Sequence, residues 1–320
     1  MKKLLVAAAA GLLLAGPLVP EPAQAQSGFR VTLLGTASPS PRPTRFGPST
    51  LVEAGNQKFV IDAGRGVPIR LWQLKVPMGK IDVLFITHYH SDHVSGIPDL
   101  WLTGWLSPPF GQRKTAFHVI GPAGAKSLME NLEKAYALDI KTRIADEKLP
   151  PEGVAVKVDE FDKDGVVYEK DGVKVIAFEN HHGDLIHPSY GYRIEYNGHA
   201  AVISGDTTYN ENVIKYGRGA DLLIHEVGMA RPELMTIPAV QRIIAHHTPP
   251  DEAGKVFAQT KPKLAAYTHI VMLSNAQIPE PTLDDLVAET RKTYTGPLEV
   301  GEDLMSFEIG DAVTVHRFNN

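Results

Sequence analysis

The sequence predicts an α/β fold of four layers, in which two mixed β-sheets pack face to face and helices cover both outer faces. Short β-like runs dominate both halves of the chain, and segments with helical periodicity accompany them in each half. Because each sheet must bury an apolar face, two strand-rich halves with outer helices imply an αββα sandwich. No low-complexity linker separates the halves, so we expect a single domain over residues 26–320.

The expected elements follow one another along the chain. Residues 67–76 suggest a short helix, and Pro122 is expected to open a longer one, with apolar residues at helical spacing from Ala125 to Ala135. Asp171-Gly172 and Asn197-Gly198 are hairpin signals. The remaining expected elements are strands at 29–34, 49–54, 58–62, 83–86, 154–158, 166–169, 173–178, 190–196, 200–204, 222–227 and 264–267, and helices at 250–258 and 283–293.

Residues 1–25 have the composition of a secretory signal peptide. Lys2 and Lys3 precede an apolar run from Leu4 to Leu14, and Ala23-Gln24-Ala25 fits the small-x-small cleavage rule. The alternative is an uncleaved anchor, although the run is short for a membrane span. We expect cleavage, no stable membrane span afterwards, and a periplasmic or secreted bacterial protein.

The net charge and the cysteine content limit the partners and the metal ligands that we expect. The formal net charge is −5 at pH 7, whereas nucleic-acid-binding proteins normally present a basic face, so no nucleic-acid partner is expected. The chain contains no cysteine. Its core must therefore suffice without disulfides, and a metal ion would have to be held by histidine and carboxylate side chains.

The segment Thr87-His88-Tyr89-His90-Ser91-Asp92-His93, here called the metal loop, places four possible metal ligands directly after an apolar run. His88 and His90 lie two residues apart and can point the same way, while Asp92 and His93 can address a second point nearby. Imidazole and carboxylate together favour zinc, or another borderline divalent ion, over calcium or magnesium. The metal loop therefore predicts a metal site.

Three other segments place possible ligands at the ends of expected strands. His181-His182 follows the strand at 173–178, Asp206 follows the strand at 200–204, and His269 follows the strand at 264–267. Ligands gathered from several strand ends on one rim of a sheet pair would form a single cavity. With the metal loop, they are numerous enough to hold two ions.

This pattern resembles the metallo-β-lactamase superfamily, and most closely its tRNase Z and arylsulfatase-like branch. The resemblance implies the metallo-β-lactamase fold, two divalent ions that we expect to be zinc, and hydrolysis by a hydroxide shared between them. Beside the metal loop, the matching segments occur in the family's order: Leu34-Gly35-Thr36, Phe59 to Gly64, Tyr190 to Arg193, Ser204 to Thr207, Leu223 to Glu226 and Tyr267 to His269.

The resemblance also implies three ligands for each ion and one bridging carboxylate. These are His88, His90 and His182 for one ion, Asp92, His93 and His269 for the other, and Asp206 for both. The third histidine is open between His181, His182 and His187, which share one segment. The Gly183 that follows, and the spacing to the next strand, favour His182.

Two further residues match a Glu–His pair that the branch carries near the leaving group, Glu226 and His247. An imidazolium oriented by a carboxylate is a good proton donor at neutral pH, so the pair and Asp92 are the expected catalytic residues. The alternative is that Glu226 only positions a metal-bound histidine. Asp62 is expected to support the metal loop through hydrogen bonds.

The resemblance implies that tRNase Z carries a long basic arm between the Gly-Tyr-Arg and Ser-Gly-Asp-Thr strands. Only residues 194–203 lie there in this chain. We therefore expect a small ester as substrate, a phosphodiester or an aryl sulfate, and rank tRNA 3′ processing lower. The alternatives are lactone or β-lactam hydrolysis, and metal or ligand binding without turnover. A homodimer is compatible with the resemblance.

Overall fold

The structure is a computed structural model that describes residues 28–318. The expected signal peptide at residues 1–25 lies outside the described residues, so its cleavage and the expected export stay predictions. Within residues 28–318, no helix is both long enough and apolar enough to cross a membrane.

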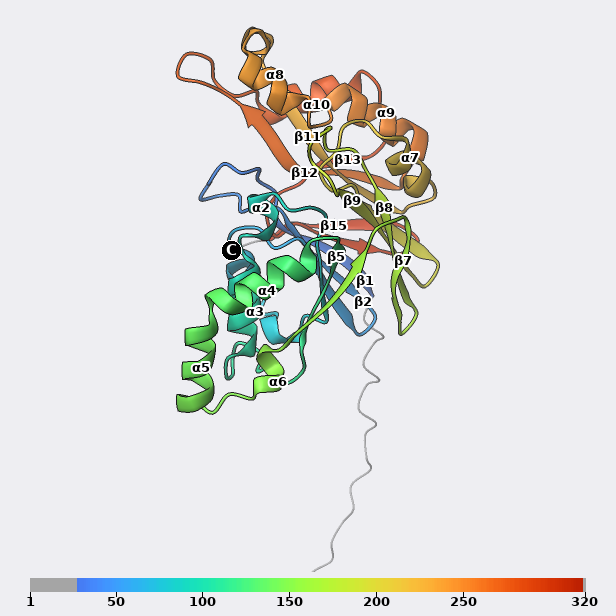
Figure 1. The fold of residues 1–320 in the computed structure, drawn as a ribbon. Helices are drawn as coiled ribbons and strands as arrows, with labels where there is room; N and C mark the ends of the chain where they lie inside the picture. The colour runs from blue at the N-terminus through green and yellow to red at the C-terminus, as the bar shows by residue number, and fades with distance from the viewer. Residues whose placement is uncertain (1–27, 319–320) are drawn as a thin grey trace, which may run out of the picture.

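Two mixed β-sheets form the centre of the molecule, as the sequence predicts. Figure 1 shows α3 to α6 on one outer side of the sheet pair and α7 to α10 on the other. A central apolar cluster lies between the sheets, and two outer clusters lie between each sheet and its helices. The observed layers therefore have the expected αββα order.

The first sheet carries the strands of the N-terminal half and the C-terminal hairpin. In spatial order it consists of β15 (Val313–His316), β14 (Ser306–Ile309), β1 (Phe29–Gly35), β2 (Ser49–Ala54), β3 (Gln57–Ile61), β4 (Val83–Phe85), β5 (Phe117–Pro122) and β6 (Val156–Phe161). Its connections contain α1 (Val67–Gln73), η1 (Met78–Lys80), α2 (Ser91–Val94), α3 (Ile97–Trp105), α4 (Ala125–Ala135), α5 (Ala137–Asp146) and α6 (Pro151–Val154).

The second sheet carries the strands of the C-terminal half. In spatial order it consists of β13 (Leu298–Val300), β12 (Leu264–Leu273), β11 (Leu222–Ala230), β10 (His199–Ile203), β9 (Tyr190–Tyr196), β8 (Val173–Glu179) and β7 (Gly165–Lys170). Its connections contain α7 (Glu211–Gly217), η2 (Pro232–Thr236), α8 (Pro238–Ile244), α9 (Pro250–Thr260) and α10 (Leu283–Arg291).

Strand alternation explains how each sheet supplies two apolar layers. In β11, Leu222 and Ile224 belong to the cluster between the sheets, whereas Leu223 belongs to the cluster under α7, α9 and α10. In β1, Leu33 faces the other sheet and Leu34 faces the helices. Both faces of β1 and β11 are buried, which is why these two segments read as continuous apolar runs.

The expected helix start at Pro122 is wrong. Pro122 is the last residue of β5 and pairs with Phe161 of β6, and the helix begins at Ala125. Gly124 provides the turn with a φ of 115°, a backbone conformation that glycine adopts without a steric penalty. Proline at the end of a strand needs no N–H donor in the ladder, so it fits there as well as at a helix start.

The hairpin between β9 and β10 is as short as the sequence predicts. Asn197 and Gly198 form its turn with φ values of 50° and 79°, which suits a two-residue connection. No arm projects from this point of the described chain. The second sheet therefore passes directly from β9 to β10, whose end carries a candidate ligand.

One carboxylate near the C-terminus ties three N-terminal segments together. Asp303 accepts hydrogen bonds from the backbone N–H of Thr36 at 3.0 Å and of Phe46 at 2.7 Å, and from the Arg70 guanidinium at 2.8 Å. Arg70 and Asp303 are both largely buried. The contact fixes the loop after β1 against α1, next to the metal loop.

Candidate metal centre

The metal loop leaves the first sheet at the end of β4 and turns into α2 (Figure 1). Asp62 anchors it, since its carboxylate accepts hydrogen bonds from the Thr87 backbone N–H at 2.8 Å and the Thr87 hydroxyl at 2.7 Å. The same carboxylate lies 2.7 Å from His93 Nδ1. The expected supporting role of Asp62 is confirmed, because it holds the loop at both ends.

The other ligand candidates come from the second sheet. His182 follows β8 and Asp206 follows β10, both as expected. His269 instead lies inside β12, which continues to Leu273. It has a φ of 42°, and the register between β11 and β12 shifts beside it, after Glu226. This irregularity turns the imidazole towards the metal loop, and the apolar run alone did not reveal it.

The structure brings all seven candidate ligands together in two groups that can each hold an ion. The first group is His88, His90, His182 and Asp206, and the second is Asp92, His93 and His269.

Asp206 lies between the two groups. Its Oδ2 atom is 3.6 Å from His182 Nε2 in the first group, and 3.3 Å and 3.1 Å from the Nε2 atoms of His93 and His269 in the second. Asp92 Oδ2 is 3.3 Å from His269 Nε2. A buried carboxylate in this position can serve two cations at once.

The buried nitrogens of the cluster fit divalent cations. The Nε2 atoms of His88 and His93 are buried and have no hydrogen-bond partner within residues 28–318. Their Nδ1 atoms are engaged, at 3.0 Å from Thr87 Oγ1 and 2.7 Å from Asp62. His182 follows the same scheme, with Nδ1 2.8 Å from the His246 carbonyl oxygen. Histidines that ligate metal typically use one nitrogen for the ion and the other for such a partner.

The electrostatics agree with ligation. Burial lowers the pKa of His182 to about 4, and burial with neighbouring His93 holds the pKa of His88 well below its usual range, so both imidazoles are neutral donors at pH 7. Burial raises the pKa of Asp206, but His269 and His93 outweigh it and keep that pKa low. In contrast, burial lowers the pKa of His93, but Asp206 and Asp62 outweigh it and raise that pKa well above its usual range. An ionised Asp206 beside the neutral imidazoles of His88 and His182 attracts cations.

The choice between three neighbouring histidines is resolved by their directions. His182 is 1% exposed and faces the cluster. His181 is partly exposed and contacts Thr208 and Asp184, while His187 is exposed beside His181. The preference for His182 over its neighbours therefore agrees with the geometry.

Glu226 contacts His247 rather than a histidine of the two ligand groups. Its Oε2 atom is 3.0 Å from His247 Nδ1, and its Oε1 atom accepts the Thr248 N–H at 2.7 Å. Burial lowers the pKa of His247, but the attraction and hydrogen bond of Glu226 outweigh it and raise that pKa. His247 also lies with Asp206 and His269 in a third possible ligand group, a proximity that the sequence did not indicate.

The comparisons with known proteins agree with this site. A family model described as a beta-lactamase superfamily domain matches residues 57–270. A ribonuclease Z from Mycolicibacterium gilvum is 35% identical over 296 residues, covering 89% of this chain and 98% of that protein. A ribonuclease Z from Mycolicibacterium paratuberculosis is 36% identical over 286 residues, covering 88% and 98%.

Solved structures show the same fold at lower identity. The metallo-β-lactamase fold protein YhfI from Bacillus subtilis has a TM-score of 0.68 at 20% identity, covering 88% of this chain and all of that one. The short form of human tRNase Z has a TM-score of 0.65 at 22% identity, covering 88% and 99%. The chain therefore belongs to the metallo-β-lactamase superfamily of metal-dependent hydrolases, in the branch that contains the ribonuclease Z proteins.

Proposed function

We propose that the protein is a metal-dependent ribonuclease that hydrolyses a phosphodiester bond of tRNA. The observation that carries the proposal is its 31–36% identity, along nearly the whole length of each protein, to relatives named Ribonuclease Z. The two ligand groups and the Glu226–His247 pair supply the chemistry that such a reaction needs.

The relatives overturn two expectations from the sequence. The prediction that a small ester, a phosphodiester or an aryl sulfate, ranks above tRNA as the substrate is wrong, and so is the prediction that no nucleic acid is a partner. The charge argument failed because a net charge of −5 is a sum over the whole chain and does not describe the surface around one site.

The short β9–β10 hairpin does not argue against RNA either. The alignment with the Mycobacterium marinum ribonuclease Z has 289 residues and covers 88% of this chain and 99% of that protein. That coverage leaves no space for a long insertion in the relative. A protein named Ribonuclease Z can therefore lack the long basic arm, so the arm is not a general requirement of the branch.

We propose that His88, His90 and His182 hold one ion, that Asp92, His93 and His269 hold the other, and that Asp206 contacts both. Zinc is the proposed metal because imidazole and carboxylate ligands together suit it better than calcium or magnesium. When bound, two such ions act as Lewis acids on a phosphoryl oxygen and lower the pKa of water.

The protein's own contribution is to hold the ligands and to supply a proton. Glu226 accepts the Nδ1–H of His247 and so leaves Nε2 to face the reacting bond. His247 would donate its proton to the departing oxygen, a step that typically contributes about 10²–10⁴ in rate. The bond from Thr248 N–H to Glu226 fixes the carboxylate and therefore the imidazole.

A cleavage assay with matched substrates tests the proposal. The zinc-loaded full chain is incubated with a tRNA precursor carrying a 3′ extension, with mature tRNA, and with bis-aryl phosphate, aryl sulfate and lactone substrates. We expect cleavage of the precursor, lost in Asp92→Ala. Turnover of the lactone or sulfate without cleavage of the precursor would contradict it.

A further inference from the structure

One histidine of the metal cluster differs from the others in its second nitrogen. The Nδ1 atoms of His88, His93 and His182 all have protein partners, and His90 is partly exposed, so solvent can serve its outward nitrogen. His269 is 2% exposed and turns Nε2 to Asp206 and Asp92. Its Nδ1 is buried and has no partner among the described residues.

A small cavity lies directly beside this imidazole, between the ends of the two sheets. It has a volume of about 20 Å³. One buried water needs about 10–15 Å³ by the same measure, so there is space for a single molecule. The polar residues around the cavity are Ser49, Thr50, Asp62, His93, Asp206, Glu226, Thr268 and His269.

A second polar atom of the same lining is also unsatisfied. Ser49, at the start of β2, is 3% exposed, and its hydroxyl oxygen has no hydrogen-bond partner in the described part of the chain. Leaving a buried polar group unpaired costs about 1–3 kcal/mol. Two such groups on one water-sized cavity form a site that a water molecule would satisfy.

We propose that this cavity holds a resident water molecule through which Ser49 positions His269. The water accepts the Nδ1–H of His269 and donates to the Ser49 hydroxyl oxygen, two groups of the cavity lining that have no partner among the described residues. His269 thereby gains the outer partner that the other buried histidines obtain directly from protein atoms. Ser49 is a positioning residue, since it acts on the ion only through the water and His269.

This inference rests on the proposed metal binding by His269 and does not depend on the substrate. It predicts that Ser49→Ala weakens binding of zinc at one of two sites by about 10-fold, the lower end of the usual cost of losing an outer partner of a ligand. The measurement is competition between the metal-free full chain and a chromogenic chelator. Thr260→Ala is the control, because within residues 28–318 its buried hydroxyl donates hydrogen bonds only to carbonyl oxygens of α9.

A crystal structure of the zinc-loaded wild type supplies the second measurement. We expect one ordered water within about 2.7–3.2 Å of both His269 Nδ1 and Ser49 Oγ. An empty cavity, or zinc affinity in Ser49→Ala equal to that of Thr260→Ala, would overturn the inference. Weakened zinc binding in Ser49→Ala together with no cleavage of tRNA by the wild type would leave this inference standing and remove the proposed function.

Discussion

Two histidine-rich loops meet at the metal centre, but they differ in how many of their side chains face it. In the metal loop, all three histidines and Asp92 face the cluster. In residues 180–188, only His182 does so, while His181, Asp184 and His187 face solvent or each other. Both loops follow a strand, so position along the sheet edge does not explain the difference.

The difference lies in what anchors each loop. Asp62 binds the first and last residues of the metal loop, and α2 then fixes the directions of Asp92 and His93. In the second loop, the bond between His182 Nδ1 and the His246 carbonyl orients one imidazole, and the exposed neighbours lack a comparable buried partner. The number of histidines in a segment therefore indicates a site, but buried hydrogen bonds decide which of them ligate.

The largest expected effect separates the two aspartates of these loops. Asp92→Ala should lower tRNA cleavage by at least about a thousandfold, because loss of an ion removes several kcal/mol of transition-state stabilisation and each 1.36 kcal/mol is tenfold. Asp184→Ala, at an exposed carboxylate, should leave kcat/KM within about twofold of the wild type. Equal rates for the two variants would remove Asp92 from the mechanism.

Removal of metal should destabilise the protein through the same loop. A ligand present at about a thousand times its Kd stabilises the folded state by about 4 kcal/mol, which corresponds to roughly 10 °C in Tm for a domain of this size. Calorimetry before and after chelation measures this change. Chelation should lower the Tm of Asp92→Ala by less than it lowers the Tm of Asp184→Ala. A Tm that chelation leaves unchanged in the wild type and in both variants would show that the cluster holds no metal.

A smaller effect is expected within the second loop. His182→Ala should reduce the content of bound zinc and lower tRNA cleavage by about a hundredfold, because one ion loses one of its three imidazole ligands. His181→Ala is the matched control, one residue away and partly exposed, and should retain two ions. Elemental analysis of both variants checks this, and loss of metal in His181→Ala instead would reverse the assignment.

The smallest effect concerns the anchor of the metal loop. Asp62→Asn keeps the shape of the side chain but weakens its bond to His93, so zinc affinity should fall by about tenfold. Chelator competition measures the affinity, and thermal unfolding of the metal-free protein shows whether the fold itself has changed. An unaltered affinity would mean that Asp62 only supports the backbone at Thr87.

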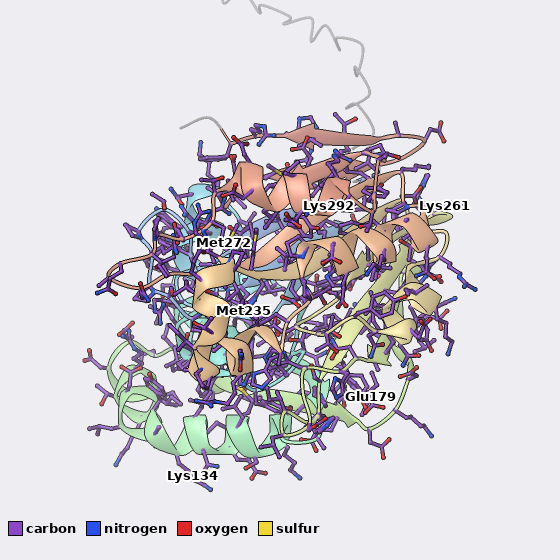
Figure 2. All side chains as sticks on the ribbon, turned by 90° about the horizontal axis from the view of Figure 1, so that it is seen from above. Lys134, Glu179, Met235, Lys261, Met272 and Lys292 are labelled. Atoms are coloured by element: carbon purple, nitrogen blue, oxygen red, sulfur yellow. The ribbon has the colours of Figure 1, made fainter. Side chains whose placement is uncertain are left out.

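Sequence reasoning located the site better than it located the elements around it. The seven ligand positions follow from motifs shared with the family, and six of them come after a strand end, which fixes where a following side chain can lie. His269 is the exception, because it lies inside β12. The helices that start at Ser91 and Ile97 and the strands at Leu298, Ser306 and Val313 were not predicted, since their short segments carry weak periodicity. Figure 2 labels Met235, in η2, and Met272, in the extension of β12, two segments that the sequence did not predict.

Some features of the site depend on long-range contacts that no local pattern encodes. The approach of His247 to Asp206 and His269 requires the irregular pairing of β11 with β12. The bond from His182 to the His246 carbonyl joins residues 64 positions apart. The prediction that no nucleic acid is a partner failed for a different reason, because the net charge of the whole chain and the missing arm were given more weight than the motifs shared with tRNase Z.

The separation of the ligands along the chain has a consequence for how the centre is assembled during synthesis. His93 leaves the ribosome well before His269 and Asp303 have been made. At roughly 5–20 residues per second, the interval between His93 and His269 is roughly 10–35 s. During that time the metal loop has three imidazoles and a carboxylate but lacks the later ligands that complete either group. The nascent chain can therefore bind adventitious ions until the strands that carry those ligands have been made.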